Sequence, residues 1–358
     1  MKVLHCAETI KGGVATVLKQ IALAQISSSD FSHVICMIPD TQSSELNEVP
    51  ATNLCLYRRS GRNISSFWQF AKRFISILLK EKPDVVHIHS TFAGFMARLI
   101  LMVFYPIRQP AVIYCPHAFA FLMEGSGIKK NLYVYIEKFL SLITDKIICV
   151  SQFEYEAAKK LGISPSKMAV VHNGVPVREG IDKHYSHDTL NLLFVGRLDF
   201  QKGYDLLVTA MREISDESIH LTIVGDSVNG ETEKVPLKNI TYTGWVKSTE
   251  IERYFVNADA LVIPSRWEGF AMVPLEAMSY GLPVISSDST SFPEVVKDQV
   301  TGYLFKNGDA EELKEKILAL KESDLNKLGS EGNKVFREHF SSQAMIDKTF
   351  SLYQIVLS

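Results

Sequence analysis

Two glutamates frame a segment that could hold a phosphate together with a sugar. Residues Glu268–Pro283 read EGFAMVPLEAMSYGLP and follow an apolar run typical of a buried strand. Pro274 predicts a helix start, because the first helical position needs no N–H, and this puts Glu276 in the first turn. The N–H groups of Phe270–Val273 would then face a phosphate, and Glu268 could accept hydrogen bonds from sugar hydroxyls. A plain strand–helix unit with two solvated glutamates fits the spacing equally well.

Two cations five positions apart form a second candidate site for phosphate. Arg197 and Lys202 lie in the segment GRLDFQKG that starts at Gly196, directly after a strand-like run. At the C-terminal edge of a parallel sheet this loop would face the ligand crevice. The arginine supplies a planar fork and the lysine a point charge, which together suit a diphosphate. A solvated loop with two unrelated cations is the alternative.

Other residues follow strand-like runs where loops would border a ligand: His117, Gly12, Gly13, Asn173, Trp245 and Val246. His117 comes after a proline at a strand end, although a lone histidine is often simply packed. The two glycines would let a ligand approach the backbone, but their spacing lacks the G-x-G-x-x-G dinucleotide fingerprint. Asn173 precedes Gly-Val and could equally belong to a plain turn.

The segment from Pro264 to Val284 resembles, without a gap, the signature of the retaining glycosyltransferases of the fourth sequence family, the glycosyl transferases group 1. The pattern G-R-L-x-x-x-K-G resembles the donor-diphosphate motif of that family, and the N-G-V at 173–175 resembles its N-G-V/I motif. One departure is Ala271, where the family more often has glycine. Its methyl group would lie close to the sugar phosphate.

The resemblance implies an α/β protein of the GT-B fold. Two doubly wound Rossmann-like domains would face each other across a cleft, and the C-terminal helix would cross back to the first domain. The implied reaction moves a hexose, with retention, from a UDP-linked donor to a hydroxyl of a glycan acceptor in polysaccharide, lipopolysaccharide or glycoconjugate synthesis. Many members use lipid-linked acceptors, so a polyprenyl-diphosphate-linked acceptor is expected. No nucleic-acid partner is expected.

The same resemblance assigns roles to the residues. Arg197 and Lys202 would neutralise the leaving diphosphate, Glu268 would hold sugar hydroxyls, and His117 would line the acceptor side; these four are the candidate catalytic residues. Glu276 would hold the ribose hydroxyls. The candidate donor-binding residues are Gly12, Gly13, Asn173, Gly196, Arg197, Lys202, Trp245, Val246, Glu268, Gly269, Phe270, Ala271, Met272, Val273 and Glu276.

No metal or other cofactor is expected. The chain has no D-x-D, the pattern that holds a divalent metal in another glycosyltransferase fold, and it has no P-loop. His87 and His89 would share one face of a strand, but no carboxylate is near them in the sequence. A nucleotide-sugar epimerase or hydrolase of the same fold stays open as an alternative function. A nicotinamide-dependent dehydrogenase and a non-catalytic sugar-nucleotide binding protein are less favoured.

Alternating strand-like and helical segments predict the doubly wound sheets that would position these residues. Strands are expected at 2–8, 33–39, 53–57, 84–90, 111–116, 146–151 and 168–175, and then at 191–198, 220–226, 240–246, 259–265 and 283–288. The polar, aperiodic stretch 177–188 is the expected linker. It would separate an acceptor-binding domain at 1–176 from a nucleotide-sugar-binding domain at 189–340, with 341–358 as the returning helix.

Composition agrees with a two-domain protein at the cytoplasmic side of a membrane. The chain has 358 residues, enough for two cores, and none of its five cysteines forms a C-x-x-C pair. Met1 leads into a strand-like run without an apolar signal region, and no charge-free apolar stretch reaches the ~18 residues that span a bilayer. The expected location is the cytoplasm, with peripheral contact at the inner face of the cell membrane.

The charge is divided unevenly along the chain. Residues 1–175 carry 19 Lys and Arg against 12 Asp and Glu, whereas residues 176–358 carry 19 against 28. A helical pattern from Ile64 to Leu79 mixes cations with aromatic residues, and three arginines precede it: Arg58, Arg59 and Arg62. Such a face suits an anionic lipid surface. A surface helix of a soluble domain shows the same mixture.

Overall fold

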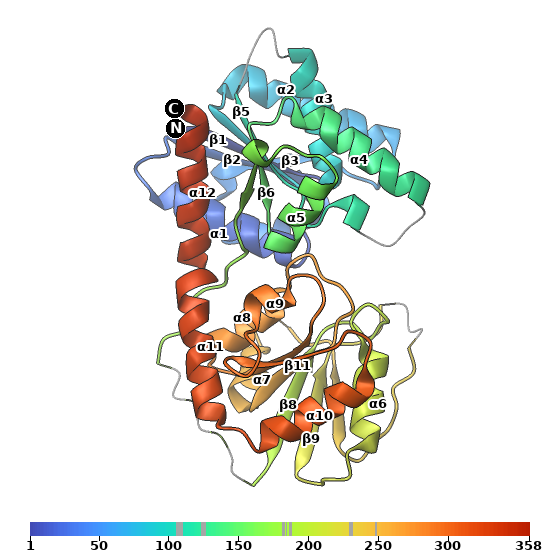
Figure 1. Cartoon of the computed structure of the whole chain (residues 1–358). Coiled ribbons are helices and arrows are strands. Elements are labelled where there is room, and N and C mark those ends of the chain that lie inside the picture. Colours follow the sequence, from blue (N-terminus) through green and yellow to red (C-terminus); the bar gives the residue numbers. More distant parts are fainter. Residues whose placement is uncertain are drawn as a thin grey trace. The chain divides into compact units, whose positions relative to one another are not determined.

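Two parallel sheets form the frame of the chain, one in each of two units (Figure 1). In this computed structural model, unit 1 comprises Met1–Asn173 with Met345–Ser358, and unit 2 comprises Gly174–Ala344. The described residues are 1–104, 110–122, 127–180, 183, 185, 188–228, 232–247 and 249–358. The change of unit falls at 173/174, ahead of the linker expected at 177–188. Positions 181, 182, 184, 186 and 187 of that linker lie outside the described residues.

Unit 1 holds a seven-stranded sheet in the order β3-β2-β1-β4-β5-β6-β7. Its strands are β1 Lys2–Ala7, β2 His33–Pro39, β3 Leu54–Tyr57, β4 Val85–His89, β5 Ala111–Cys115, β6 Lys146–Cys149 and β7 Met168–Val170. Its helices are α1 Gly13–Ser27, α2 Ile64–Glu81, α3 Thr91–Phe104, α4 Gly127–Ser141, α5 Gln152–Lys160 and, from Met345 on, α12 Ser342–Leu357, with short 3-10 turns at Asp40–Leu46, Ala51–Asn53, Ala120–Leu122 and Pro165–Lys167.

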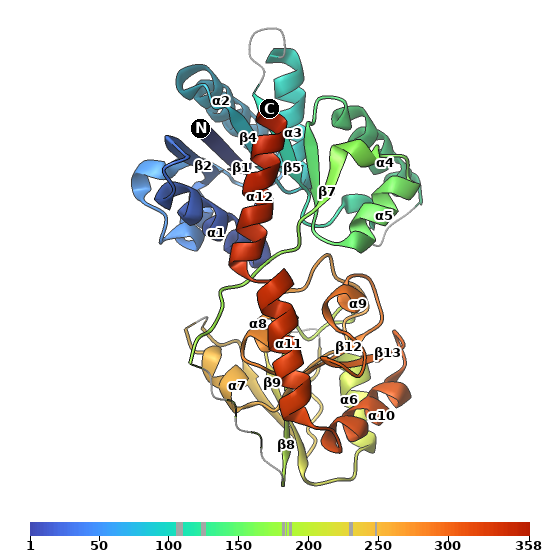
Figure 2. The ribbon, with the colours of Figure 1, turned by 60° about the vertical axis from the view of Figure 1, so that its left-hand side comes forward.

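Alternation along the unit-1 strands separates an apolar face from a polar, buried one. Leu4 and Cys6 of β1 belong to the core cluster that also contains Phe70 and Phe74 of α2. His5, between them, points to the opposite face, where its ring reaches Gln25 of α1. The C-terminal helix α12 lies beside α1 on this second face, as Figure 2 shows.

Unit 2 holds a six-stranded sheet in the order β10-β9-β8-β11-β12-β13. Its strands are β8 Leu190–Val195, β9 Ile219–Val224, β10 Ile240–Gly244, β11 Ala260–Ile263, β12 Val284–Ser287 and β13 Gly302–Phe305. Its helices are α6 Tyr204–Glu213, α7 Glu252–Asn257, α8 Met272–Ser279, α9 Phe292–Val295, α10 Ala310–Lys321 and α11 Leu325–His339. Helix α6 packs against α10, and α8 packs against α11.

Other predictions from the sequence can be compared with the described residues. The five cysteines are free thiols, and all are buried. No helix in the described part of the chain combines the length and apolar character needed to span a bilayer. The alternation of strands and helices is confirmed in both units, but β13 was not predicted.

A buried ion pair joins α3, α4 and β5 in unit 1. The side chain of Arg98 has no solvent exposure, and its Nη2 donates to Glu137 Oε2 at 2.8 Å. The guanidinium also lies 3.9 Å from the ring centre of Tyr114, whose hydroxyl donates to Glu137 at 3.0 Å. Because α3 follows β4 and Tyr114 lies in β5, this cluster anchors two neighbouring strands.

Glu137→Ala should therefore destabilise the chain by about 3–5 kcal/mol, because the buried guanidinium of Arg98 loses its charge partner. Urea unfolding would measure the change. A suitable control is Glu156→Ala, which removes an exposed pair with Lys159 and should cost less than about 1 kcal/mol. Equal stability of Glu137→Ala and wild type would contradict the importance of the pair.

Candidate active site

The unit-2 sheet reverses its winding direction between β8 and β11. In open parallel sheets, ligands bind beyond the carboxyl ends of the strands at such a switch point. Gly196 directly follows β8, and Glu268 lies in the segment between β11 and α8. The structure therefore gathers the two main donor motifs where the topology predicts a ligand.

Two glycines allow the loops at this edge to approach one another. Gly203 has φ 69°, and a Cβ there would lie 2.0 Å from the carbonyl oxygen of Pro264. A Cβ at Gly225 would lie 1.8 Å from the carbonyl oxygen of Gly196. Both positions thus require glycine, and the loop after β8 is pressed against the loops after β9 and β11.

Lys202 and Glu268 form an ion pair across the switch point. The Nζ of Lys202 contacts Oε1 of Glu268, and the two side chains are only 17% and 12% exposed. The backbone N–H of Glu268 also donates to Thr290 Oγ1 at 3.2 Å. The sequence predicted a diphosphate ligand for the lysine and a sugar ligand for the glutamate, but it did not predict that the two residues touch.

Arg197 has partners within its own loop. Its Nε lies 3.2 Å from Asp199 Oδ2, and its Nη2 donates to Gln201 Oε1 at 2.7 Å. Its side chain is 42% exposed, more than that of Lys202. Each of the two predicted phosphate-binding cations therefore has a carboxylate partner, and their convergence on one diphosphate stays a prediction.

Helix α8 begins two residues earlier than predicted, at Met272 instead of Pro274. Proline is tolerated as the third helical residue because an N–H there would have no intrahelical partner. The N-cap is Ala271, and no side chain caps the helix, so the N–H groups of Met272 and Val273 have no partner within it. Gly269 is partly exposed before the buried Phe270.

Glu276 is the fifth residue of α8, beyond the first turn in which the sequence placed it. Its burial raises the pKa from 4.5 to about 7, and the nearby Arg178 opposes that rise. A carboxyl group with this pKa exchanges its proton near neutral pH. The predicted ribose contact would therefore depend on pH.

Trp245 and Val246 follow β10, at the edge of the unit-2 sheet. Trp245 is 60% exposed, and Val246 is partly buried. Strand β9 separates β10 from β8, so this loop lies two strands from Gly196. The structure places these residues on the correct edge of the sheet, and their contact with a donor stays a prediction.

Unusual backbone geometry marks the corresponding edge of unit 1. Ser90, His117 and Ala118, which follow the neighbouring strands β4 and β5, have φ values of 75°, 56° and 132°. Non-glycine residues adopt such values at a cost, and they cluster at functional sites. Gly12, the N-cap of α1, is exposed, with φ 59° and open space around its missing Cβ, and Gly13 beside it is partly exposed.

His117 is the end of a hydrogen-bonded chain of histidines. Its Nε2 lies 3.0 Å from His89 Nδ1, and His89 Nε2 lies 3.0 Å from His5 Nδ1. The chain ends at Gln25, whose Oε1 lies 2.7 Å from His5 Nε2. Since an amide oxygen only accepts, His5 must donate from Nε2, and each further histidine then also donates from Nε2. This order leaves Nδ1 of His117 as an acceptor.

The histidines are neutral in this environment. Burial lowers the pKa of His5 and of His117 to about 4, and it lowers the pKa of His89 well below its ordinary value. His87 lies on the same face, where its Nδ1 contacts the Tyr353 hydroxyl of α12 at 2.6 Å. His5, His87 and His89 could geometrically surround a metal ion. However, the ring nitrogens of His5 and His89 are engaged in the chain, so their arrangement favours hydrogen bonding.

Asn173 is buried and lines a cavity of about 10 Å³ with His117 and Thr349. Its neighbour Gly174 belongs to unit 2, where a Cβ would lie 2.4 Å from the carbonyl oxygen of Ser341. The N-G-V motif thus has a packing reason for its glycine. The sequence did not reveal the roles of Gln25, His5 and Tyr353, and only the H-x-H spacing of His87 and His89 signalled a cluster.

Comparison with known proteins agrees with this geometry. Residues 11–179 match the family described as Glycosyltransferase Family 4, and residues 180–335 match the family described as Glycosyl transferases group 1. A Klebsiella pneumoniae protein described as "Uncharacterized 41.2 kDa protein in cps region" is 40% identical over 354 residues, covering 96% of this chain and 95% of that protein.

Two further proteins are similar over most of the chain. The UDP-Gal:alpha-D-GlcNAc-diphosphoundecaprenol alpha-1,3-galactosyltransferase of Escherichia coli is 28% identical over 320 residues, covering 82% of this chain and 81% of that protein. The apo structure of the lipopolysaccharide outer core galactosyltransferase WaaB has a TM-score of 0.75 at 21% identity and covers 99% of both chains. This likeness confirms the GT-B fold class.

The pKa of Glu276 gives a testable pH dependence of stability. The folded chain holds this proton up to about pH 7, whereas the unfolded chain releases it near 4.5, so the stabilising effect of the protonated carboxyl declines between those pH values. Melting temperatures of wild type should therefore fall relative to those of Glu276→Gln as the pH rises from 5 to 8. Glu217→Gln, at an exposed site, is the control. A constant difference between wild type and Glu276→Gln over this range would disprove the shift.

Proposed function

The chain belongs to the glycosyl transferases group 1, and we propose that it moves a hexose from a UDP-linked donor to a hydroxyl of a lipid-linked glycan with retention of configuration. The donor would bind at the switch point of unit 2. The acceptor would bind at the edge of unit 1 that carries His117. The product would contribute to a surface polysaccharide or lipopolysaccharide.

The Lys202–Glu268 pair is the observation that carries this proposal. A cation for phosphate and an acceptor for sugar hydroxyls touch each other, and the acceptor lies in the segment just before the uncapped helix α8. A sugar diphosphate carries the two complementary groups next to each other: an anionic diphosphate and sugar hydroxyls that donate hydrogen bonds. The glutamate holds the lysine in place before the donor arrives, so that little reorganisation is needed when it binds.

Stabilisation of the leaving diphosphate would be the main catalytic contribution. Charge develops on the phosphate oxygen as its bond to the sugar breaks. Lys202, Arg197 and the N–H groups at the start of α8 would oppose that charge. Glu276 would accept hydrogen bonds from the ribose when it is deprotonated.

Same-face attack would account for retention. The acceptor oxygen forms its bond to the sugar carbon on the face that the diphosphate leaves, and a phosphate oxygen takes the acceptor proton. His117 would orient an acceptor hydroxyl, because the histidine chain leaves its Nδ1 as a hydrogen-bond acceptor. The low pKa of His117 keeps that lone pair available at neutral pH.

A lipid-linked acceptor is supported by one relative and by the surface of α2. The Escherichia coli relative is named for a diphosphoundecaprenol acceptor. In this chain, Ile64 and Trp68 of α2 are 78% and 66% exposed, and the exposed Lys72 lies on the same helix. Such a helix suits peripheral contact with an anionic membrane from the cytoplasmic side.

Substitutions of the ion pair should separate diphosphate binding from sugar transfer. Lys202→Ala should weaken UDP binding and, like Arg197→Ala, cost roughly 2–4 kcal/mol of transition-state stabilisation. Glu268→Gln should reduce transfer but preserve UDP binding, because it removes the sugar contact and leaves the lysine charge. Calorimetry with UDP and transfer assays would measure both effects. Arg212→Ala, an exposed change in α6, is the control. Loss of UDP binding in Glu268→Gln would show that the glutamate is structural.

Transfer should persist in EDTA, because two cations and a helix start take the place of a metal at the diphosphate. The assay would offer a set of UDP-hexoses with a lipid-linked glycan acceptor, in the presence and absence of the chelator. Activity lost in EDTA and restored by magnesium or manganese would contradict the proposal. Release of free UDP without an acceptor would favour the epimerase or hydrolase alternative.

A further inference from the structure

A pocket of about 370 Å³ lies at the switch point of the unit-1 sheet. The sheet changes winding direction between β1 and β4. The pocket is lined by Glu8, which follows β1, by Tyr57 and Arg59 at the end of β3, and by the first turns of α2 and α3. The pocket thus occupies the position in unit 1 that the donor motifs occupy in unit 2.

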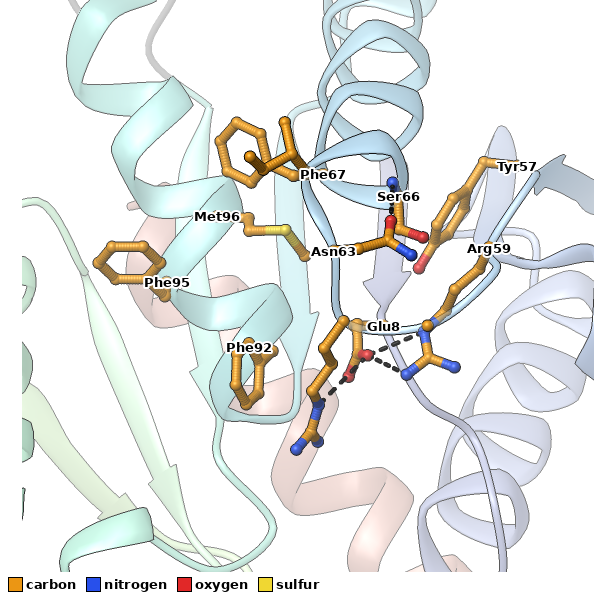
Figure 3. Close-up of a pocket in the computed structure, with 12 residues that line it drawn as sticks. Glu8, Tyr57, Arg59, Asn63, Ser66, Phe67, Phe92, Phe95 and Met96 are labelled. Atoms are coloured by element: carbon orange, nitrogen blue, oxygen red, sulfur yellow. Dashed lines mark hydrogen bonds and ion pairs between the residues drawn. The ribbon is translucent and has the colours of Figure 1, made fainter.

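One wall of the pocket is apolar and open to solvent. Figure 3 shows Phe67, Phe92, Phe95 and Met96 together on one side, opposite Glu8 and Arg59. The three phenylalanines are 36–38% exposed, and Ile64 at the start of α2 is 78% exposed. These side chains offer few hydrogen-bond partners to sugar hydroxyls, so the wall favours an apolar ligand.

The other end of the pocket carries a net positive charge. Arg59 donates through Nε to Glu8 Oε1 at 2.8 Å, and this pair is largely buried. Arg62 adds a second cation, with its Nε 3.6 Å from the same carboxylate oxygen and its guanidinium 4.0 Å from the centre of the Phe92 ring. Two arginines against one glutamate leave an excess of one positive charge beside the apolar wall.

Hydrogen bonds fix the shape of the loop between β3 and α2 that carries Arg59 and Arg62. Asn63 caps α2 by accepting from the Ser66 N–H at 2.9 Å, and the Ser60 N–H donates to Ser66 Oγ at 3.1 Å. Gly61 has φ 138°, which other residues rarely adopt. The loop is therefore pre-organised, and its hydrogen bonds fix the position of Arg62 relative to the apolar wall.

We propose that this pocket binds the lipid diphosphate of the acceptor. The diphosphate would lie against Arg59 and Arg62, and the first part of the lipid chain would lie between the aromatic side chains of α2 and α3. A cationic end next to an apolar wall matches an anionic group joined to a hydrocarbon. This inference rests on the proposed function, because it names the acceptor of that reaction.

The location of the pocket suits a sugar attached to that diphosphate. Ala7, His89 and Cys115 are aligned across β1, β4 and β5. Glu8 and His117 follow just beyond, so the strands that carry them are two spacings apart, roughly 10 Å. A glycan that starts at the diphosphate beside Arg62 would extend along this edge toward His117.

The test measures binding of farnesyl diphosphate to the full-length chain by titration calorimetry, with inorganic pyrophosphate and farnesol as comparison probes. Farnesyl diphosphate should bind about tenfold or more tightly than either part alone, because only it uses both ends of the pocket. Arg62→Ala should weaken this binding by roughly tenfold. Phe95→Ala should weaken farnesyl diphosphate but leave pyrophosphate unchanged. Arg212→Ala in unit 2 is the matched charge control.

UDP binding and sugar transfer, measured in the same preparations, separate the two proposals. Unchanged UDP affinity with weakened farnesyl diphosphate binding in Arg62→Ala would support the pocket. Equal affinity for farnesol and farnesyl diphosphate, or no effect of Arg62→Ala, would overturn the pocket assignment even if wild type transfers sugar from UDP-hexose. If wild type binds farnesyl diphosphate as expected but neither binds UDP nor transfers sugar, the proposed function fails and the lipid-diphosphate site stands.

Discussion

The ion pair between Lys202 and Glu268 spans the point where the unit-2 sheet reverses its winding. A largely buried pair contributes little net stability, because removing both charges from water offsets most of their attraction. Its main effect here is to fix the positions of the two side chains. The pair holds a cation against a carboxylate in the segment that precedes α8, and the glycines at 203 and 225 permit the close packing of these loops. The proposed donor site depends on this arrangement.

In unit 1, neutral histidine side chains position the candidate site residue His117. Several buried histidines in contact would repel one another if they were charged, and burial lowers their pKa values accordingly. Each contact in the chain then has one donor and one acceptor nitrogen, so the Gln25 side chain sets the tautomer of His117 through two intervening rings. A residue on α1 thereby determines that Nδ1 of His117 would meet a ligand as a hydrogen-bond acceptor.

The sequence predicted the features that depend on local pattern. Strand-like runs followed by glycines and charged residues located the loops at the sheet edge, and the spacing of Arg197 and Lys202 placed both cations in one loop. It did not reveal the histidine chain, because the hydrogen-bond partners of His5 are Gln25 and His89, which lie 20 and 84 positions away in the sequence. Pro274 misplaced the start of α8, since proline is tolerated throughout the first turn. The four-residue strand β13 begins with Gly302, which weakens the strand pattern.

The two switch points share a similar arrangement of charged side chains. In each unit a carboxylate beyond a central strand pairs with a cation from the loop after another strand: Glu8 with Arg59, and Glu268 with Lys202. A ligand diphosphate would share the cation with that carboxylate, which reduces the positive charge that the pair alone offers. Each site has a more exposed second arginine, Arg62 or Arg197, at 60% and 42% exposure. The less exposed cation of each site, Arg59 or Lys202, gives the site its shape, and the more exposed arginine is easier for a diphosphate to reach. On the proposed function, one such site would hold the diphosphate that leaves, and the other would hold the diphosphate that stays attached to the acceptor.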